Sequence, residues 1–158
     1  MAEVSFYHLT QAPLDQALPK LLHMIYQRGL RTLVHGPAEA ALARLDAQLW
    51  AFSETVFLPH ACAKDAPEDA QQPLLLSKSR QNANEAEVLV LIDGARIDLQ
   101  EVPKYTRVCL LFEDGQSTHL QEAREDWAAL AQANVLATYW AQSEAGWVKK
   151  ASRQPTGG

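Results

Sequence analysis

The hydrophobic pattern of the chain centres on residues 88–92, where five branched apolar residues follow one another without a polar interruption. A strand with one solvated face alternates apolar and polar residues, so this run predicts a strand that is buried on both faces. Three of the five residues are β-branched, which favours an extended backbone, and Gly94 closes the run soon afterwards. A buried helix segment is the alternative, but five residues are too few for one. A strand covered on both faces needs helices above and below it, which predicts a layered α/β fold with a mostly parallel sheet.

Further strands are predicted on both sides of this run. Residues 107–113 form a second apolar stretch, and Asp114-Gly115 ends it. Shorter stretches complete the set: residues 4–8, residues 31–35, residues 73–76, and a closing hairpin of residues 136–140 with residues 146–149. Residues 62–72 are polar and interrupted by proline, which predicts a loop. Residues 96–103 predict a short helix or an irregular crossover.

Three helices are predicted from apolar residues that recur every three to four positions. The first ends at Gly29, and it can contain Pro19 only if it begins late enough to place that proline in its first turn. The second follows the turn at Gly36-Pro37 and carries a stripe of leucines. The third covers about residues 117–133, and Asn134, which tolerates a left-handed backbone, can end it.

Length and composition are those of one ordinary domain. The chain has 158 residues, and we expect a single α/β domain over residues 1–150 followed by a flexible C-terminal tail over residues 151–158. Two cysteines are too few for a disulfide framework, and the N-terminus has neither a basic segment nor a long apolar one, so we expect a cytoplasmic protein. No run of about 18 apolar residues predicts a membrane span. The net charge of −5 argues against a broad non-specific grip on nucleic acid.

Sequence motifs for catalysis are missing. One turn has the strand, Gly-Pro and helix layout of a Rossmann-like unit, but neither GxGxxG nor a GxxxxGK[ST] phosphate loop occurs. Asp93 ends the central strand, where α/β enzymes place catalytic carboxylates, or else it forms a simple turn with Gly94. A small Rossmann-like nucleotide-binding enzyme that uses Asp93 is therefore the alternative function. His60 and Cys62 have no second pair of ligands at zinc spacing, and Cys109 lies in an apolar strand, so no metal or other cofactor is predicted.

An aromatic and proline cluster after the second helix indicates a surface for a partner. Trp50, Phe52 and Phe57 follow one another without helical or strand spacing, and Pro59 and His60 come next. The rings either expose apolar surface or cover the bottom of the sheet. Spacing alone leaves both interpretations open.

A second group lies on the third helix, where Arg124 and Trp127 are one turn apart. Trp127 fits the apolar stripe of the helix, so packing in the core explains it equally well. Arg124 lies at the edge of that stripe. Together the two side chains predict a cationic rim beside an aromatic floor, or else a core tryptophan beside a solvated arginine.

At these residues the chain resembles a known family. The matching segments are residues 4–8 (VSFYH), 44–50 (RLDAQLW), 57–60 (FLPH), 123–127 (AREDW), 138–140 (TYW) and 146–150 (GWVKK). In that order and at those intervals they are similar to the chi subunit of the bacterial DNA polymerase III holoenzyme. The resemblance covers nearly the whole chain, and the combination of RLDxxLW with FxPH is its specific part.

The resemblance implies a Rossmann-like fold similar to nucleotide-binding helicase domains, without a working phosphate loop. It also implies a non-enzymatic accessory of the clamp loader, which bridges the psi subunit and single-stranded DNA-binding protein and so associates with DNA indirectly. The family's psi-binding surface matches Trp50, Phe57, Pro59 and His60. A helicase-type repair partner is a further expectation.

The family's other site takes the acidic, phenylalanine-ended C-terminal tail of single-stranded DNA-binding protein. Arg124 and Trp127 match that site. The position after the aromatic residue is often basic in the family, but here it is Ala128, and Leu120 brings no charge either. Asn134 replaces the usual glycine after the helix. The resemblance therefore implies a tail pocket that relies on Arg124 together with some other cation.

Overall fold

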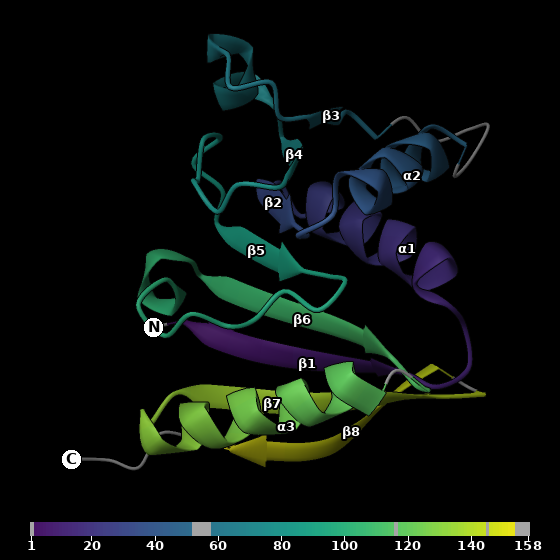
Figure 1. Ribbon diagram of the computed structural model, residues 1–158, viewed down its shortest axis with the longest axis vertical. Coiled ribbons are helices and arrows are strands. Elements are labelled where there is room, and N and C mark those ends of the chain that lie inside the picture. The colour runs from purple at the N-terminus through teal and green to yellow at the C-terminus, as the bar shows by residue number, and fades with distance from the viewer. Residues whose placement is uncertain (1, 52–57, 116, 145, 154–158) are drawn as a thin grey trace.

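The structure is a computed structural model that describes residues 2–51, 58–115, 117–144 and 146–153. Its strands form one sheet in the order β3-β4-β2-β5-β6-β1-β7-β8, as Figure 1 shows. The strands are β1 (Glu3–Leu9), β2 (Thr32–His35), β3 (Ala61–Cys62), β4 (Leu74–Ser77), β5 (Val88–Leu91), β6 (Arg107–Glu113), β7 (Leu136–Ser143) and β8 (Gly146–Arg153). Every neighbouring pair is parallel except β7 with β8, which form an antiparallel hairpin. The predicted α/β fold with a mostly parallel sheet is confirmed.

The central strand is buried on both faces, as its uninterrupted apolar run predicts. β5 lies between β2 and β6. Leu89 and Leu91 belong to the hydrophobic core on one side of the sheet, and Val88 and Val90 belong to the core on the other side. All four residues are at most 2% exposed. The sheet therefore separates two cores, each of which needs its own cover.

Three helices supply most of that cover in the described part of the chain: α1 (Leu14–Gln27), α2 (Glu39–Trp50) and α3 (Ser117–Gln132). The apolar residues of α1 and α2 pack into one core, and those of α3 pack into the other. α1 contacts β2 and β6, α2 contacts β3 and β4, and α3 contacts β6 and β7. Figure 1 shows α3 crossing the half of the sheet that contains β7 and β8, with α1 and α2 beside the other half. Asn134 ends α3 with a φ of 58°, the left-handed backbone expected of it.

The first helix starts earlier than the sequence predicts. α1 begins at Leu14, so Pro19 lies in its second turn, and the expectation of a late start is wrong. A proline at this position removes the hydrogen bond to the carbonyl group of Asp15, which lies four residues earlier and close to the start of the helix. Pro19 is itself buried, and burial of its ring offsets part of that cost.

The segment predicted to be a loop over residues 62–72 contains some regular structure, so that prediction is wrong in part. Ala61–Cys62 form the edge strand β3, and Pro67–Gln71 form a 3-10 helix. The buried Asp69 carboxylate accepts hydrogen bonds from the backbone N–H groups of Lys64 and Asp65, at 3.0 to 3.2 Å. These local bonds fold the segment into a tight turn that periodicity does not reveal.

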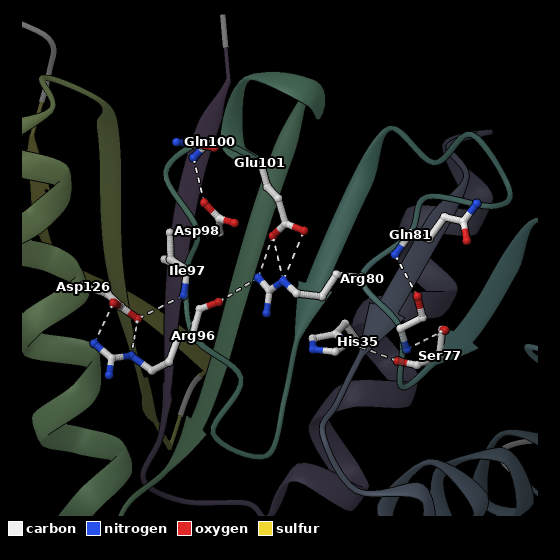
Figure 2. Close-up of polar contacts among 11 residues, drawn as sticks. His35, Ser77, Arg80, Gln81, Arg96, Ile97, Asp98, Gln100, Glu101 and Asp126 are labelled. Atoms are coloured by element: carbon white, nitrogen blue, oxygen red, sulfur yellow. Dashed lines mark hydrogen bonds and ion pairs between the residues drawn. The ribbon is translucent and has the colours of Figure 1, made fainter.

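The connection from β5 to β6 covers the sheet without an α-helix. It contains only the 3-10 helix Val102–Lys104, and Figure 2 shows the two arginines that fasten it. Arg80 binds the Glu101 carboxylate at 2.6 Å and donates to the carbonyl oxygen of Arg96 at 2.8 Å. Arg96 in turn donates to both carboxylate oxygens of Asp126 on α3, at 2.9 and 3.2 Å. The irregular crossover is therefore held on one side by the β4–β5 loop and on the other by α3.

The C-terminal hairpin is longer than predicted. β8 extends through Arg153, three residues past the expected domain end at residue 150. Residues 154–158 of the predicted tail lie outside the described residues. None of the helices in the described ranges is both long and apolar enough to cross a membrane.

Candidate functional site

Trp50 is a surface residue at the end of α2. The helix buries Leu42, Leu45 and Leu49 against the sheet. Trp50 follows directly after Leu49 and is rotated by about 100° from it, and it is 55% exposed. The alternative in which this ring covers the bottom of the sheet is therefore excluded for Trp50. Phe52 and Phe57 lie outside the described residues.

His60 supports the Trp50 ring from below. The two ring centroids are 4.3 Å apart, and the His60 side chain is fully buried. His60 Nδ1 lies 2.7 Å from the carbonyl oxygen of Leu58, and Nε2 lies 3.2 Å from Asp46 Oδ1 and 3.3 Å from the Asp46 carbonyl oxygen. Asp46 is one turn before Trp50 on α2, so the helix that carries the tryptophan also holds its support.

These contacts define a site, here called the Trp50 surface: the exposed Trp50 ring, the buried His60 beneath it, and Pro59, which precedes His60 in the chain. Pro59 is half-buried between two buried neighbours, Leu58 and His60. An exposed ring whose position is fixed before binding loses little conformational entropy when a partner covers it. The described part of the predicted psi-binding set is therefore brought together, with Phe57 outside the described residues.

Trp127 lies at the boundary between core and surface. The ring is half-buried and packs edge-on against Phe6, with centroids 5.3 Å apart, and against Tyr139, with centroids 6.1 Å apart. The Trp127 ring is therefore partly packed in the core and partly available at the surface. Arg124 is exposed one helical turn earlier. Burial raises the pKa of the Tyr139 phenol, and the nearby Arg124 guanidinium opposes that rise.

Tyr139 and His8 complete this second site, here called the Arg124 surface: Arg124, Trp127, Tyr139 and His8. The hydroxyl group of Tyr139 lies 2.8 Å from His8 Nδ1, and His8 Nε2 lies 3.0 Å from Asp114 Oδ1. Sequence reasoning gives neither residue a role. Both lie in segments that carry the family resemblance, but only the parallel pairing of β1 with β7 places them beside α3.

The charge around the Arg124 surface is mixed. Leu120 is half-buried and Ala128 is exposed, so neither departure from the family pattern supplies a cation. Arg96 approaches three carboxylates of α3, those of Glu122, Glu125 and Asp126, at 2.9 to 3.6 Å. Arg124, one helical turn before Trp127, is therefore the predicted cation of this surface, while Arg96 is engaged in holding the crossover.

The Trp50 surface and the Arg124 surface lie on different parts of the molecule. Trp50 ends α2, which packs over β3 and β4, whereas Arg124 lies on α3, which packs on the other face over β6 and β7. Figure 1 shows the two helices at opposite ends of the sheet. The two surfaces therefore do not overlap.

Asp93 forms a turn, and the space beside it is small. Asp93 and Gly94 have φ values of 56° and 82°, so both residues are left-handed. Asp93 borders a cavity of about 70 Å³ at the carboxyl ends of β5 and β6, which Arg44, Glu113 and His119 also line. Pockets that hold small molecules enclose about 300–1,000 Å³. The cavity beside Asp93 is smaller than such pockets.

His60 and Cys62 are not part of a cluster of metal ligands in the described part of the chain. The two ring nitrogens of His60 lie within hydrogen-bond distance of oxygen atoms of Leu58 and Asp46. Cys62, two residues later in the chain, is half-buried. No group of three or more histidine, cysteine, aspartate or glutamate side chains is positioned to hold a metal ion among the described residues. Cys109 is 1% exposed in β6, which confirms it as a core residue.

The fold and its surfaces define a class of protein: a Rossmann-like α/β domain with a small cavity at its strand ends and with exposed aromatic residues away from it. The model of the family described as DNA polymerase III chi subunit, HolC, matches residues 1–138. The chain therefore belongs to the DNA polymerase III chi subunit family.

Two relatives agree with this assignment. A probable DNA polymerase III subunit chi of Rickettsia prowazekii is 28% identical over 109 residues, which are 68% of this chain and 66% of the relative. The chain thus spans just under two thirds of that protein. The DNA polymerase III subunit chi of Pseudomonas aeruginosa is 28% identical over 114 residues, which are 70% of this chain and 77% of the relative.

Proposed function

We propose that this chain is a non-catalytic accessory subunit of the DNA polymerase III holoenzyme that acts in replication by joining two proteins. The Trp50 surface binds the psi subunit of the clamp loader. The Arg124 surface binds the acidic C-terminal tail of single-stranded DNA-binding protein, which links the chain to DNA indirectly. The observation that carries the proposal is the exposed Trp50 ring held on a fully buried histidine, because the fold alone does not require that arrangement.

Truncation of Trp50 tests the first contact. Large rings at the centre of an interface can each contribute about 2 kcal/mol or more to binding. We expect Trp50→Ala to abolish co-purification with psi and to leave the melting temperature nearly unchanged, because the ring is 55% exposed. Leu99→Ala is the control, since Leu99 is also a large apolar residue at the surface, 40% exposed, in the connection from β5 to β6. Psi binding that survives Trp50→Ala would refute the assignment of this surface.

Removal of the Arg124 charge tests the second contact. The guanidinium group offers a planar pair of donors to the peptide's carboxylate, and Trp127 with Tyr139 offers apolar walls for its terminal ring. A lost charge-assisted hydrogen bond costs about 1.5–3 kcal/mol, so we expect Arg124→Ala to weaken tail binding roughly tenfold to a hundredfold. Raising the salt concentration should weaken the wild-type complex in the same direction.

Isothermal titration with a synthetic acidic peptide that ends in Pro-Phe measures this effect. Arg44→Ala is the matched control, because Arg44 is an exposed arginine on α2. Removing the terminal phenylalanine from the peptide should weaken its binding to the wild-type chain at least as much as Arg124→Ala weakens binding of the complete peptide. Unchanged affinity in Arg124→Ala would place the tail elsewhere.

The absence of catalysis by the isolated chain is part of the same proposal. The cavity beside Asp93 is about 70 Å³, which supports a structural role for that turn. We expect no ATP hydrolysis by the purified chain. Turnover that disappears in Asp93→Ala would instead favour the nucleotide-binding enzyme.

A further inference from the structure

One side of α1 borders an apolar trough that neither the Trp50 surface nor the Arg124 surface uses. Two hollows lie along the helix, of about 320 Å³ and about 120 Å³. Leu21 and Met24 line both hollows, so they form the ridge that joins them. Trp147 of β8 forms the opposite wall of the larger hollow. Met24 is 41% exposed and Trp147 is 39% exposed, which makes this an open apolar surface.

The topology of the sheet explains why the trough is left open. α1 makes its sheet contacts with β2 and β6, whereas β1, β7 and β8 continue the same face beyond it. There the cover consists of aromatic side chains. Trp147 packs edge-on against Tyr7 at 5.1 Å, and Trp140, in register with Tyr7, packs against the same core. Across the gap from Trp147, α1 lines the larger hollow with Gln16, Ala17, Lys20, Leu21 and Met24.

The rim of the trough is positively charged, although the chain as a whole has a net charge of −5. Lys20 lines the larger hollow, and Arg28 and Arg107 line the smaller one. Lys149 lies 5.8 Å above the centre of the Trp140 ring on the face that Trp147 shares. Among the described residues, none of those that line the two hollows is acidic. Arg107 is partly neutralised by Glu3 at 3.1 Å, whereas Lys20 and Arg28 lie at the exposed surface.

We propose that this trough, here called the Met24 trough and defined by Lys20, Leu21, Met24, Arg28 and Trp147, is a third docking surface that binds an acidic, amphipathic segment of a partner protein. Charge complementarity selects the sign of the partner, because a local cationic rim attracts carboxylates that the rest of the molecule repels. The apolar floor selects side chains such as leucine or phenylalanine. Lys20 to Arg28 spans about 12 Å along the helix, the length of about two helical turns of a partner segment.

Two other occupants fit the observations less well. A single strand of nucleic acid needs a series of ring faces for its bases, but among the described residues Trp147 is the one aromatic residue that lines either hollow. A second copy of the chain would bring the same cations together across a two-fold axis. Both occupants remain distinguishable by experiment.

Selection of peptides from a random 16-residue phage-displayed library on the full chain tests the proposal. We expect enriched peptides to carry an excess of aspartate and glutamate and at least two large apolar residues three or four positions apart. Synthetic versions should bind at least tenfold more weakly to Met24→Glu and to Lys20→Glu. Binding should also shift the emission of Trp147 to shorter wavelength, and this shift should be missing in Trp147→Phe.

Leu99→Glu is the matched control, because Leu99 is 40% exposed, almost the same as Met24, but lies in the β5–β6 crossover. Selected peptides that lose affinity for Arg124→Ala bind the tail site and are set aside, and Leu99→Glu should bind the remaining peptides like wild type. If Met24→Glu proves unstable by thermal denaturation, Lys20→Glu, a rim residue, carries the test. The proposal fails if no selected peptide is sensitive to either trough variant, or if the sensitive peptides are not acidic.

Two further measurements address the other occupants. Fluorescence anisotropy with a labelled 20-nucleotide oligo-dT strand reports on nucleic acid, and light scattering across a concentration series reports on self-association. Oligo-dT binding or dimer formation that Met24→Glu abolishes would replace the proposed partner with that occupant. If oligo-dT binding and self-association are both absent, or if Met24→Glu leaves them unchanged, the acidic peptide is supported as the occupant.

Discussion

At the scale of single residues, the turn after β5 shows how one glycine fits α3 to the sheet. Gly94 has a φ of 82°, and a Cβ atom placed on it would lie 2.8 Å from Nε2 of His119. Gly115 has a similar φ of 88° but nothing within 4 Å of such an atom. The two glycines therefore share the backbone requirement and differ only in the contact with the first turn of α3.

We expect Gly94→Ala to destabilise the fold more than Gly115→Ala. A non-glycine residue in the left-handed region costs about 1–2 kcal/mol, and that cost applies to both variants. Gly94→Ala adds the clash with His119. Urea denaturation measures the difference, and His119→Ala in the Gly94→Ala background should bring the cost back toward that of Gly115→Ala. Equal destabilisation by the two single variants would show that the imidazole ring simply moves aside.

At the scale of elements, the β5–β6 crossover is the unusual part of the fold, because polar contacts hold it where parallel sheets normally use a helix. Arg96 is the residue that ties it to α3 (Figure 2). Its ion pair with the exposed Glu125 contributes little, and its contact with the half-buried Glu122 is long, at 3.6 Å. The bond to Asp126 matters more, because the Asp126 side chain is only 8% exposed and also accepts from the Ile97 N–H group at 3.2 Å.

We expect Arg96→Ala to destabilise the chain by about 1–3 kcal/mol, the cost of leaving a buried acceptor without its partner. The amide hydrogens of residues 95–106 should exchange faster in this variant, while those of β5 and β6 stay protected. Hydrogen exchange followed by mass spectrometry resolves the two segments. Arg44→Ala, an exposed arginine on α2, serves as the control and should change neither measurement. Unaltered exchange in Arg96→Ala would mean that Arg80 alone holds the crossover.

At the scale of the whole molecule, both cores contain acidic groups that folding keeps protonated. Burial raises the pKa of Cys109 to about 12, and it raises the pKa of Tyr7 and of Tyr105 to about 12 as well. Their ordinary values are 9.0 for the thiol and 10.0 for the phenols. Between those values and 12 the folded chain binds more protons than the unfolded chain. Stability therefore falls as the pH rises through that window.

We expect the free energy of unfolding to be steady up to about pH 9 and then to decrease, by about 1.4 kcal/mol per pH unit for each group that ionises only in the unfolded chain. Urea denaturation between pH 8 and about pH 11 measures the slope, and Tyr7→Phe should make it shallower above about pH 10. A flat profile up to about pH 11 would contradict the burial of these groups.

In the folded chain at neutral pH, a thiol reagent should modify Cys62, which is half-buried, and spare Cys109, which is buried.

The sequence by itself determined the fold class and most elements, because these depend on local periodicity. The uninterrupted run at residues 88–92 indicates burial on both faces wherever its neighbours lie, and the leucine stripe of α2 indicates which side of that helix is buried. The position of Trp50 relative to Leu49 follows from helical geometry. Pro19 and the Asp69 turn were mispredicted because both depend on burial and hydrogen bonds that spacing does not show.

Only the tertiary structure decided which residues meet. Tyr139 and His8 join Arg124 and Trp127 because β7 pairs with β1, more than 120 residues away in sequence, and no local pattern encodes that neighbour. The Met24 trough likewise exists because the sheet continues past α1, so residues of α1 and β8 that look like scattered surface positions in sequence form one cationic, apolar surface. Periodicity reports how deeply a segment is buried, whereas a site requires specific neighbours, and those depend on the order of strands in the sheet.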